Sequence, residues 1–322
     1  MIRVRALILM LWAVVLAIAA PVFAQEAASN RRIALTFDDV PRGAGAFFTP
    51  DERTKRLIAA LREAGVEQAA FFVTTGNLGT PDGAGGEARI VAYVAAGHVI
   101  ANHSHTHPHL DQISAEAYLA DLDRAAAWLK GRAGYRPWFR FPFLDEGGRD
   151  AARRDAVRAG LAARGLRNGY VTADGSDWHL EALTVDAARA GRMMDMAALR
   201  KLYLQSQLGG IAYHDALARR TLGRSPPHVM LLHETDLAAL FIADLVAELR
   251  KDGWTIITAD AAYADAELAD AMPIVPHTSG TLTGMIAWER GVQPPYAPLW
   301  MGTEMMSWLF ETKVIASPAP QE

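Results

Sequence analysis

Short apolar segments rich in β-branched and aromatic residues alternate along this chain with segments of helical periodicity, and this alternation limits the fold more than any other feature. The sequence predicts strands at residues 33–37, 68–74, 98–101, 138–141, 168–171, 228–232 and 254–258. It predicts helices over residues 51–64, 88–96, 114–129, 150–164, 184–220 and 237–250. Strands separated by helices favour a parallel α/β sheet or barrel.

Polar side chains stand at or just after the ends of five predicted strands. They are Asp38-Asp39, the histidine run that begins at His103, and then Arg140, Asp174 and His233. The carboxyl ends of parallel strands meet at one edge of a sheet, and α/β folds build their active sites there. We therefore expect these groups to converge on one site.

Four of the ten histidines lie within seven positions, at His103, His105, His107 and His109. Imidazole is a common ligand of transition metals, and the chain has no cysteine that could replace it. A spacing of four puts His103 and His107 on one face of a helical turn, whereas an extended segment would add His105. With Asp38 or Asp39 as a third ligand, the pattern predicts an open, catalytic metal site. A solvated polar loop is the alternative.

Two adjacent carboxylates at a strand end point in different directions. One of Asp38 and Asp39 can therefore bind the metal while the other acts as a general base. Arg140 is the candidate partner that keeps the free carboxylate ionised, with a surface salt bridge as the alternative. His233 follows the apolar run 229–232 and is the candidate acid, with a structural core histidine as the alternative.

The N-terminus has the pattern of an export signal. Arg3 and Arg5 precede an apolar run over residues 7–20, and small residues precede a cleavage site after Ala24. We expect a periplasmic or secreted protein without stable membrane insertion, an uncleaved anchor being the alternative. Residues 25–322 carry 30 basic and 36 acidic side chains, and this net charge of −6 argues against nucleic acid as a partner.

The C-terminal extension, residues 266–322, differs from the rest of the chain. Residues 273–298 are rich in Pro, Gly and Thr and are predicted to form a loop, and the apolar segment 299–310 follows. We expect the extension to pack on the domain, with a substrate lid or partner-binding patch as the alternative. The residues from Ser317 onward are expected to be a disordered tail.

Five short motifs follow one another in the order Thr36-Phe37-Asp38-Asp39, His103-Ser104-His105-Thr106-His107, Arg140-Phe141-Pro142-Phe143, Asp174-Gly175-Ser176-Asp177-Trp178 and Leu231-Leu232-His233. In this order, over residues 33–258, they resemble the motifs of the polysaccharide deacetylases of the NodB-homology type, carbohydrate esterase family 4. The resemblance implies an α/β fold, a distorted and incomplete (β/α) barrel with a parallel strand core. It places the catalytic domain at residues 31–265.

The resemblance also implies the metal ligands. Asp39, His103 and His107 would hold one divalent ion, foremost Zn²⁺, with Co²⁺ or Ni²⁺ as alternatives. His105 and His109 fall at variable positions of the second motif and would be neighbours of the site.

Further roles follow from the same resemblance. Asp38 would be the base and His233 the acid, while Arg140 would orient Asp38. Asp174 or Asp177 would stand behind Arg140. The pocket for the acetyl methyl group and the oxyanion would involve the side chains of Trp178 and Leu231 and the backbone N–H of Phe143.

The implied activity is hydrolysis of a carbon–nitrogen bond, in which metal-activated water removes N-acetyl groups, or O-acetyl groups, from a glycan. The alternatives are an amidohydrolase of the same fold acting on a small non-sugar amide, and a catalytically inactive glycan-binding protein. Three positions depart from the family motifs: Val40 and Leu144 replace Gly, and Glu234 replaces Asp. We expect all three on the rim where substrate enters.

Overall fold

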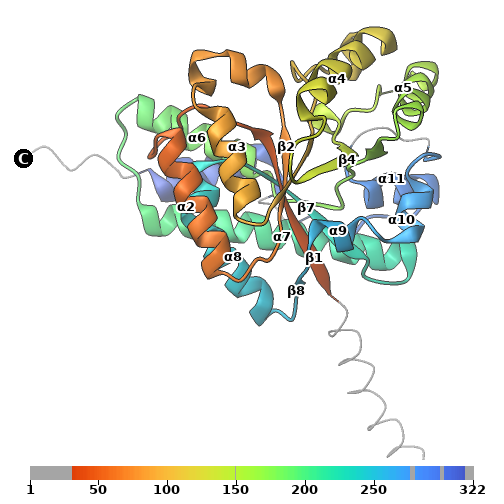
Figure 1. Cartoon of the computed structure of the whole chain (residues 1–322). Helices are drawn as coiled ribbons and strands as arrows, with labels where there is room; N and C mark the ends of the chain where they lie inside the picture. Colours follow the sequence, from red (N-terminus) through yellow and green to blue (C-terminus); the bar gives the residue numbers. More distant parts are fainter. Residues whose placement is uncertain (1–30, 149, 276–279, 298–300, 316–322) are drawn as a thin grey trace, which may run out of the picture.

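The computed structural model of this chain describes residues 31–148, 150–275, 280–297 and 301–315 (Figure 1). The predicted signal at residues 1–24 and the predicted tail from Ser317 lie outside these ranges. Within them, no helix combines the length and the apolar character that crossing a membrane requires.

Eight parallel strands form one sheet, and the predicted parallel α/β fold is confirmed. Seven lie in the order β5-β4-β3-β2-β1-β7-β6, and the eighth, β8, pairs with β1. In chain order they are β1 (Arg32–Val40), β2 (Ala70–Val73), β3 (Val99–Asn102), β4 (Tyr135–Phe139), β5 (Arg167–Asn168), β6 (Ala173–Asp174), β7 (Pro227–His233) and β8 (Thr255–Ile256).

The sheet is curled because its two edge strands are consecutive in the chain. Only residues 169–172 separate β5 from β6. Five extended residues span about 17 Å, whereas seven strands laid flat would hold the two edges about 29 Å apart. The edges must therefore approach each other, and since β5 and β6 do not pair, the barrel stays incomplete, as predicted.

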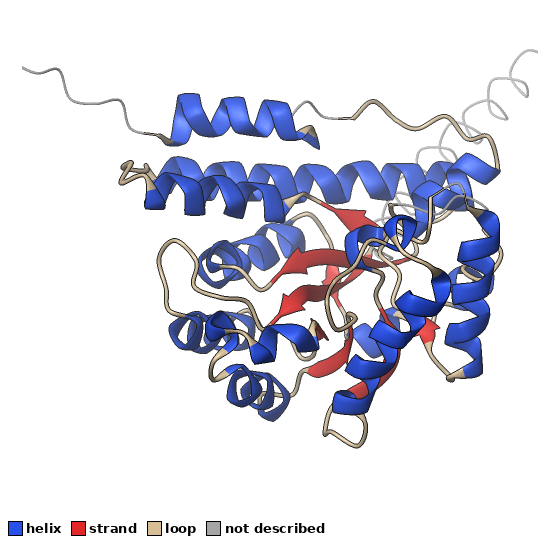
Figure 2. Ribbon diagram, turned by 90° about the horizontal axis from the view of Figure 1, so that it is seen from above, coloured by secondary structure: helices blue, strands red, loops and turns tan. Residues whose placement is uncertain are grey.

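Helices surround this curled sheet, as Figure 2 shows from above. Several begin at a side-chain cap: Thr49, Ser114 and Thr235 each accept a hydrogen bond from the backbone N–H three residues later. The helices are α2 (Pro50–Glu63), α3 (Gly86–Ala95), α4 (Ala115–Leu129), α5 (Ala151–Ala163), α6 (Asp177–Arg189), α7 (Met196–Leu222), α8 (Asp236–Lys251), α9 (Ala259–Ala262), α10 (Ala266–Ala271), α11 (Leu282–Glu289) and α12 (Thr303–Leu309).

Three predicted elements are wrong in their extent. The strand expected at 168–171 is divided into β5 and β6, which lie at opposite edges of the sheet. The helix expected over 184–220 is two helices, because Gly191 adopts φ 67° and Asp195 caps the start of α7. The loop expected at 273–298 contains α11, whose buried apolar side chains outweigh the surrounding Pro and Gly.

Alternation along the strands sends one row of side chains into the barrel and the other toward the helices. In β1, Ala34 belongs to the cluster inside the barrel, and Leu35 and Phe37 belong to the cluster beneath the helices. Thr36 and Asp38 continue the inward row of Ala34 by the two-residue period. The inward row of β1 therefore ends with the carboxylate of Asp38, which lies at the open end of the barrel.

The C-terminal extension packs on the barrel and its helices. Met306, Phe310 and Val314 join the cluster beneath the outer helices, and α11 lies against α7. His179 Nε2 lies 2.8 Å from Ser307 Oγ, so α12 also contacts α6 next to the fourth motif. The extension therefore supports one wall of the region where the motifs meet.

Candidate active site

Asp39, His103 and His107 come together at the open end of the barrel. Asp39 Oδ1 lies 3.5 Å from His103 Nε2 and 3.1 Å from His107 Nε2, and the two Nε2 atoms are 3.2 Å apart. Three donors bound at about 2.0–2.1 Å to a tetrahedral ion lie about 3.3 Å from one another. The donor types and their separations therefore fit one divalent ion.

Hydrogen bonds aim the two histidines. His103 directly follows β3, and its Nδ1–H donates to the backbone carbonyl of Arg140 at 2.8 Å. This bond leaves Nε2 facing Asp39, the orientation that such a second hydrogen bond gives to metal-bound histidines. His107 has φ 57°, and its backbone N–H donates to Ser104 Oγ at 3.0 Å. The turn between them is thus held independently of any ion.

Asp39 presents its two oxygens to different partners. Oδ1 faces the histidines, and Oδ2 accepts a hydrogen bond from Arg42 Nη1 at 2.8 Å. Burial opposes ionisation of Asp39, but hydrogen bonds from His103 and His107 and the nearby charges outweigh it and hold the pKa of this carboxyl well below its ordinary value. Asp39 is therefore an anion at neutral pH and is available as a metal ligand.

The structure places His105 and His109 outside this triad. His105 Nδ1 lies 2.8 Å from Thr75 Oγ1, and the ring of His109 stacks on Phe143 at 3.6 Å. His109, Asp111 and Asp145 form a second group of candidate ligands. Both oxygens of Asp145, however, accept backbone N–H groups, at 2.8 and 3.0 Å, which explains this carboxylate as a loop anchor.

Asp38 is buried and bound by Arg140. Arg140 Nη1 donates to the two Asp38 oxygens at 2.9 and 3.1 Å, and Asp38 Oδ2 lies 3.7 Å from His103 Nε2. A carboxylate held in this way by a buried guanidinium is fixed in direction. Asp38 lies beside the group of Asp39, His103 and His107 without belonging to it.

The remaining donors of Arg140 are also used. Nη2 donates to Thr36 Oγ1 at 3.2 Å and to the Tyr263 hydroxyl at 2.9 Å, and Nε donates to the carbonyl of Gly169. Asp174 and Asp177 do not contact Arg140 among the described residues, so their implied place behind it is wrong. Tyr263, just after α9, takes that place. No sequence motif includes Tyr263, because a single Tyr in an apolar segment has the pattern of a core residue.

Asp177 is hydrogen-bonded to His233 instead. Asp177 Oδ1 accepts from His233 Nδ1 at 2.8 Å, and Oδ2 accepts the His233 backbone N–H at 2.8 Å. Burial alone would lower the pKa of His233, but the buried Asp177 carboxylate and the charges of Asp39 and Asp38 raise it to about 9. His233 is therefore protonated at neutral pH. It is also the register partner of Asp38 on the adjacent strand.

Asp174 is the last residue of β6, and its carboxylate is hydrogen-bonded within the turn that follows. Its Oδ1 accepts the Ser176 backbone N–H at 2.7 Å, and burial raises its pKa. This bond shapes the turn that delivers Asp177 to His233.

The predicted substrate contacts are divided between the surface and the interior. Phe143 is 54% exposed and Trp178 44% exposed, both large values for aromatic side chains. Leu231 is buried on β7, next to Thr36 and Asp174 in the strand register. Phe143 also lies edge-on to His107, at 4.5 Å between ring centres.

Backbone strain is concentrated in this region. Within the described ranges, the non-glycine residues with positive φ are Asp39, Ser104, His107, Phe143, Leu144 and Ser176. Five belong to the sequence motifs and the sixth, Leu144, directly follows the third motif. Such conformations persist only where the surrounding structure holds them, and they gather at functional sites.

Two of the three departures from the family motifs are buried rather than on the rim. Val40 and Glu234 are inaccessible. Glu234 accepts the Arg42 backbone N–H at 2.7 Å and the Tyr93 hydroxyl at 2.8 Å. The prediction that all three departures lie on the rim where substrate enters is therefore wrong. Glu234 instead holds the loop that carries Arg42, through its hydrogen bond to the Arg42 backbone.

Arg53 completes this buried support. Its guanidinium donates to the carbonyls of Arg42 and Gly43 at 2.7 Å each, and it lies 3.4 Å from Asp236 and 3.6 Å from Glu234. All three charged side chains are buried. The position of the loop that carries Arg42 toward Asp39 therefore depends on the Arg53 cation, which lies between the carboxylates of Asp236 and Glu234.

Replacing Arg53 by Met is expected to lower the free energy of unfolding by about 3–5 kcal/mol, because two carboxylates would stay buried without their cation. Arg56→Met on the same helix is the control, since the Arg56–Glu52 pair is exposed and contributes about 0–1 kcal/mol. Urea unfolding of both variants measures the difference. Equal stabilities would contradict the role given to Arg53.

Solved structures with a similar arrangement share little sequence with this chain. A family 4 carbohydrate esterase from Streptomyces lividans in complex with acetate is 24% identical, with 73% of this chain and 96% of that chain covered and a TM-score of 0.47. A chitin deacetylase from Colletotrichum lindemuthianum is 20% identical, with 73% and 88% covered and a TM-score of 0.48. The peptidoglycan deacetylase PdaC from Bacillus subtilis is 18% identical, with 76% and 96% covered and a TM-score of 0.46.

No curated protein matches this chain. Residues 25–163 match the family model described as polysaccharide deacetylase, a range that contains the first three motifs. The fourth and fifth motifs lie beyond it, yet Asp177 and His233 meet the first motif in space. The match confirms the resemblance of this chain to the polysaccharide deacetylases over residues 25–163.

Proposed function

We propose that this protein is a metal-dependent hydrolase that removes acetyl groups from the amino sugars of a glycan. One observation carries the proposal: Asp38, a carboxylate bound by Arg140, and His233, a protonated imidazole, are register partners beside the three-donor group of Asp39, His103 and His107. A base and an acid next to a Lewis-acid site are what amide hydrolysis requires.

The ion held by Asp39, His103 and His107 would lower the pKa of a water molecule and polarise the acyl oxygen. Asp38 takes a proton from the attacking water, and Arg140 holds this carboxylate in position through its hydrogen bonds. His233 gives its proton to the sugar nitrogen as the carbon–nitrogen bond breaks. The products are acetate and the free amine.

The rim residues would supply substrate contacts. The exposed ring of Trp178 offers a surface on which a sugar ring can stack, and Leu231 supplies apolar surface for the acetyl methyl group. The Phe143 backbone N–H would add a hydrogen bond to the developing oxyanion. The export pattern of residues 1–24 supports a place outside the cytoplasm, in the periplasm or secreted, where glycan polymers are found.

Acetate release from a panel of substrates tests this function. The panel pairs acetylated fragments of chitin, peptidoglycan and xylan with small cyclic amides, all supplied to protein loaded with Zn²⁺, Co²⁺ or Ni²⁺. We expect turnover of N-acetylated glycan fragments. Turnover confined to the cyclic amides would replace the glycan by a small amide, and no turnover of any compound would contradict a hydrolase.

Asp177→Asn is expected to shift the alkaline limb of the pH–kcat profile to lower pH. The reason is that His233 works in its protonated form and the Asp177 charge raises its pKa toward 9, so removing that charge makes His233 lose its proton earlier. Glu311→Gln, which removes an exposed carboxylate paired with Arg192, is the control. An unchanged alkaline limb in Asp177→Asn would remove His233 from the role of acid.

A further inference from the structure

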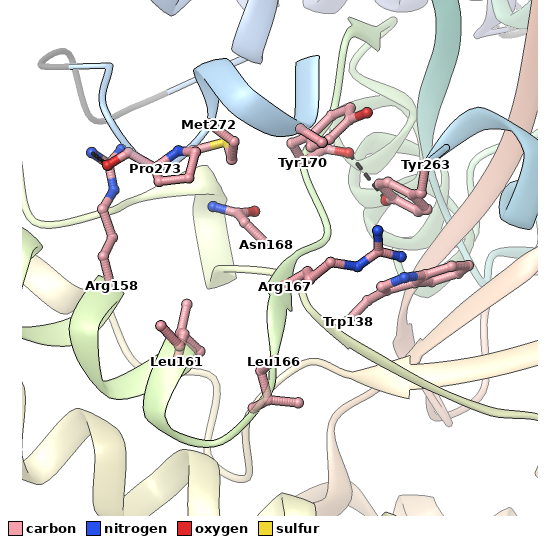
Figure 3. Close-up of a pocket in the computed structure, with 12 residues that line it drawn as sticks. Trp138, Arg158, Leu161, Leu166, Arg167, Asn168, Tyr170, Tyr263, Met272 and Pro273 are labelled. Carbon is pink, nitrogen blue, oxygen red and sulfur yellow. Dashed lines mark hydrogen bonds between the residues drawn. The ribbon is translucent and has the colours of Figure 1, made fainter. Parts of the chain in front are cut away.

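A pocket of about 170 Å³ opens on the side of the barrel, away from the metal triad. Residues of α5, β5 and the segment from Tyr263 to Pro273 line it. Figure 3 shows Trp138, Tyr170 and Tyr263 gathered on one side and Arg158 with Pro273 on the opposite side. Leu161, Leu166 and Met272 supply further apolar surface. No motif and no step of the proposed reaction uses this pocket.

Its size and walls suit a single flat ring. An apolar cavity of about 150 Å³ accommodates one benzene molecule, so this pocket has room for one ring and a small substituent. Trp138 lies 4.4 Å from Tyr263, and Tyr170 lies 5.1 Å from it, between ring centres. Aromatic walls of this kind favour an aromatic ligand over an aliphatic one of equal size.

The charged groups that line the pocket, Arg158 and Arg167, are both cations. Arg158 is already bound, because its Nε donates to Glu146 at 2.9 Å and its Nη1 to the Val275 carbonyl at 2.8 Å. Arg167 is exposed, and in the described part of the chain its side chain has neither a hydrogen bond nor an ion pair. No carboxylate lines the pocket. Its free charge is therefore positive.

Two buried donors in the aromatic wall also lack partners. The indole N–H of Trp138 and the hydroxyl of Tyr170 make no hydrogen bond among the described residues, although both side chains are more than nine-tenths buried. Buried donors are rarely left unpaired, since each loses its bond to water without a replacement. A ligand that carries acceptor atoms would satisfy them.

We propose that this pocket binds a small aromatic carboxylate, with the ring against Trp138 and Tyr263 and the carboxylate toward Arg167. The site lies two hydrogen bonds from Asp38, because the Tyr263 hydroxyl in its wall accepts from Arg140, which in turn donates to Asp38. A ligand resting on Tyr263 thus touches the residue that positions Arg140.

Fluorine NMR of the full chain with 4-fluorobenzoate tests the site, with benzoate as competitor and fluorobenzene as the neutral probe. The protein is kept free of metal by chelation, so that the carboxylate cannot bind an ion at the triad. We expect saturable binding that benzoate displaces, and weaker binding of fluorobenzene. Absence of saturable binding up to about 10 mM would overturn the proposal.

Single substitutions in and near the pocket test where 4-fluorobenzoate binds. Arg167→Met is expected to weaken 4-fluorobenzoate about tenfold, and Ala162→Phe, which fills the mouth, is expected to abolish binding. Arg164→Met is the matched control, because Arg164 follows the same helix, α5, but pairs with Asp123 outside the pocket. Binding that is equal in Arg167→Met and Arg164→Met, or fluorobenzene binding as tight as that of the acid, would overturn the carboxylate assignment. Thermal melting confirms that each variant is folded.

Discussion

Replacing Asp38 by Asn is expected to lower kcat for acetate release about 10²–10⁴-fold, the range that a positioned general base contributes. Asn has the size of Asp and can still accept a hydrogen bond from Arg140 through its amide oxygen, so the surrounding geometry is retained. It cannot take a proton from water at neutral pH. The loss should therefore fall on kcat, with KM little changed.

Two measurements make this result specific. The metal content of Asp38→Asn should equal that of the wild type, because Asp38 is not one of the three grouped donors. Asp111→Asn is the control, since it removes an exposed carboxylate from the same end of the barrel and should leave kcat unchanged. Full activity in Asp38→Asn would end its assignment as the base.

Removing one imidazole of the triad should remove the metal. His103→Ala takes away one of three donors that lie 3.1–3.5 Å apart, and we expect metal affinity to fall at least about 100-fold, with activity lost in parallel. Equilibrium dialysis against Zn²⁺ followed by metal analysis measures the affinity. Acetate release on the same samples measures activity.

His105→Ala is the matched control for this loss. It removes the same side chain two positions away, but His105 is bound to Thr75 and lies outside the triad. It should keep the affinity of the wild type. Equal loss in both variants would mean that the whole histidine run, rather than the His103–His107 pair, binds the ion.

Local sequence predicted the parts of the site that one strand or one turn determines. Asp38 lies in the inward row of β1, which continues from Ala34 and Thr36 by the two-residue period of a strand. The alternation of strands and helices likewise predicted that Asp38, His103, Arg140 and His233 would meet at one edge. The spacing of His103 and His107 narrowed the ligands but left His105 open, and the observed turn places His105 elsewhere.

What local sequence did not predict depends on distant parts of the chain. Tyr263 reaches Arg140 across 123 positions, and only the closing of the barrel brings them together. Asp177 was placed behind Arg140, whereas the tight turn at Asp174 delivers it to His233. Glu234 appeared to be a rim residue, yet it is buried because Arg53 enters from α2 to meet it. Each of these contacts is set by tertiary packing, which no motif encodes.

The central claim is that this site hydrolyses an acetylated glycan with a metal held by Asp39, His103 and His107. The most direct measurement is acetate release from an N-acetylated oligosaccharide, followed before chelation, after chelation, and after one equivalent of Zn²⁺ is returned. The account predicts release that stops on chelation and returns with the metal. Release that continues unchanged in the metal-free protein, or no release by the metal-loaded protein from any acetylated glycan, would contradict it.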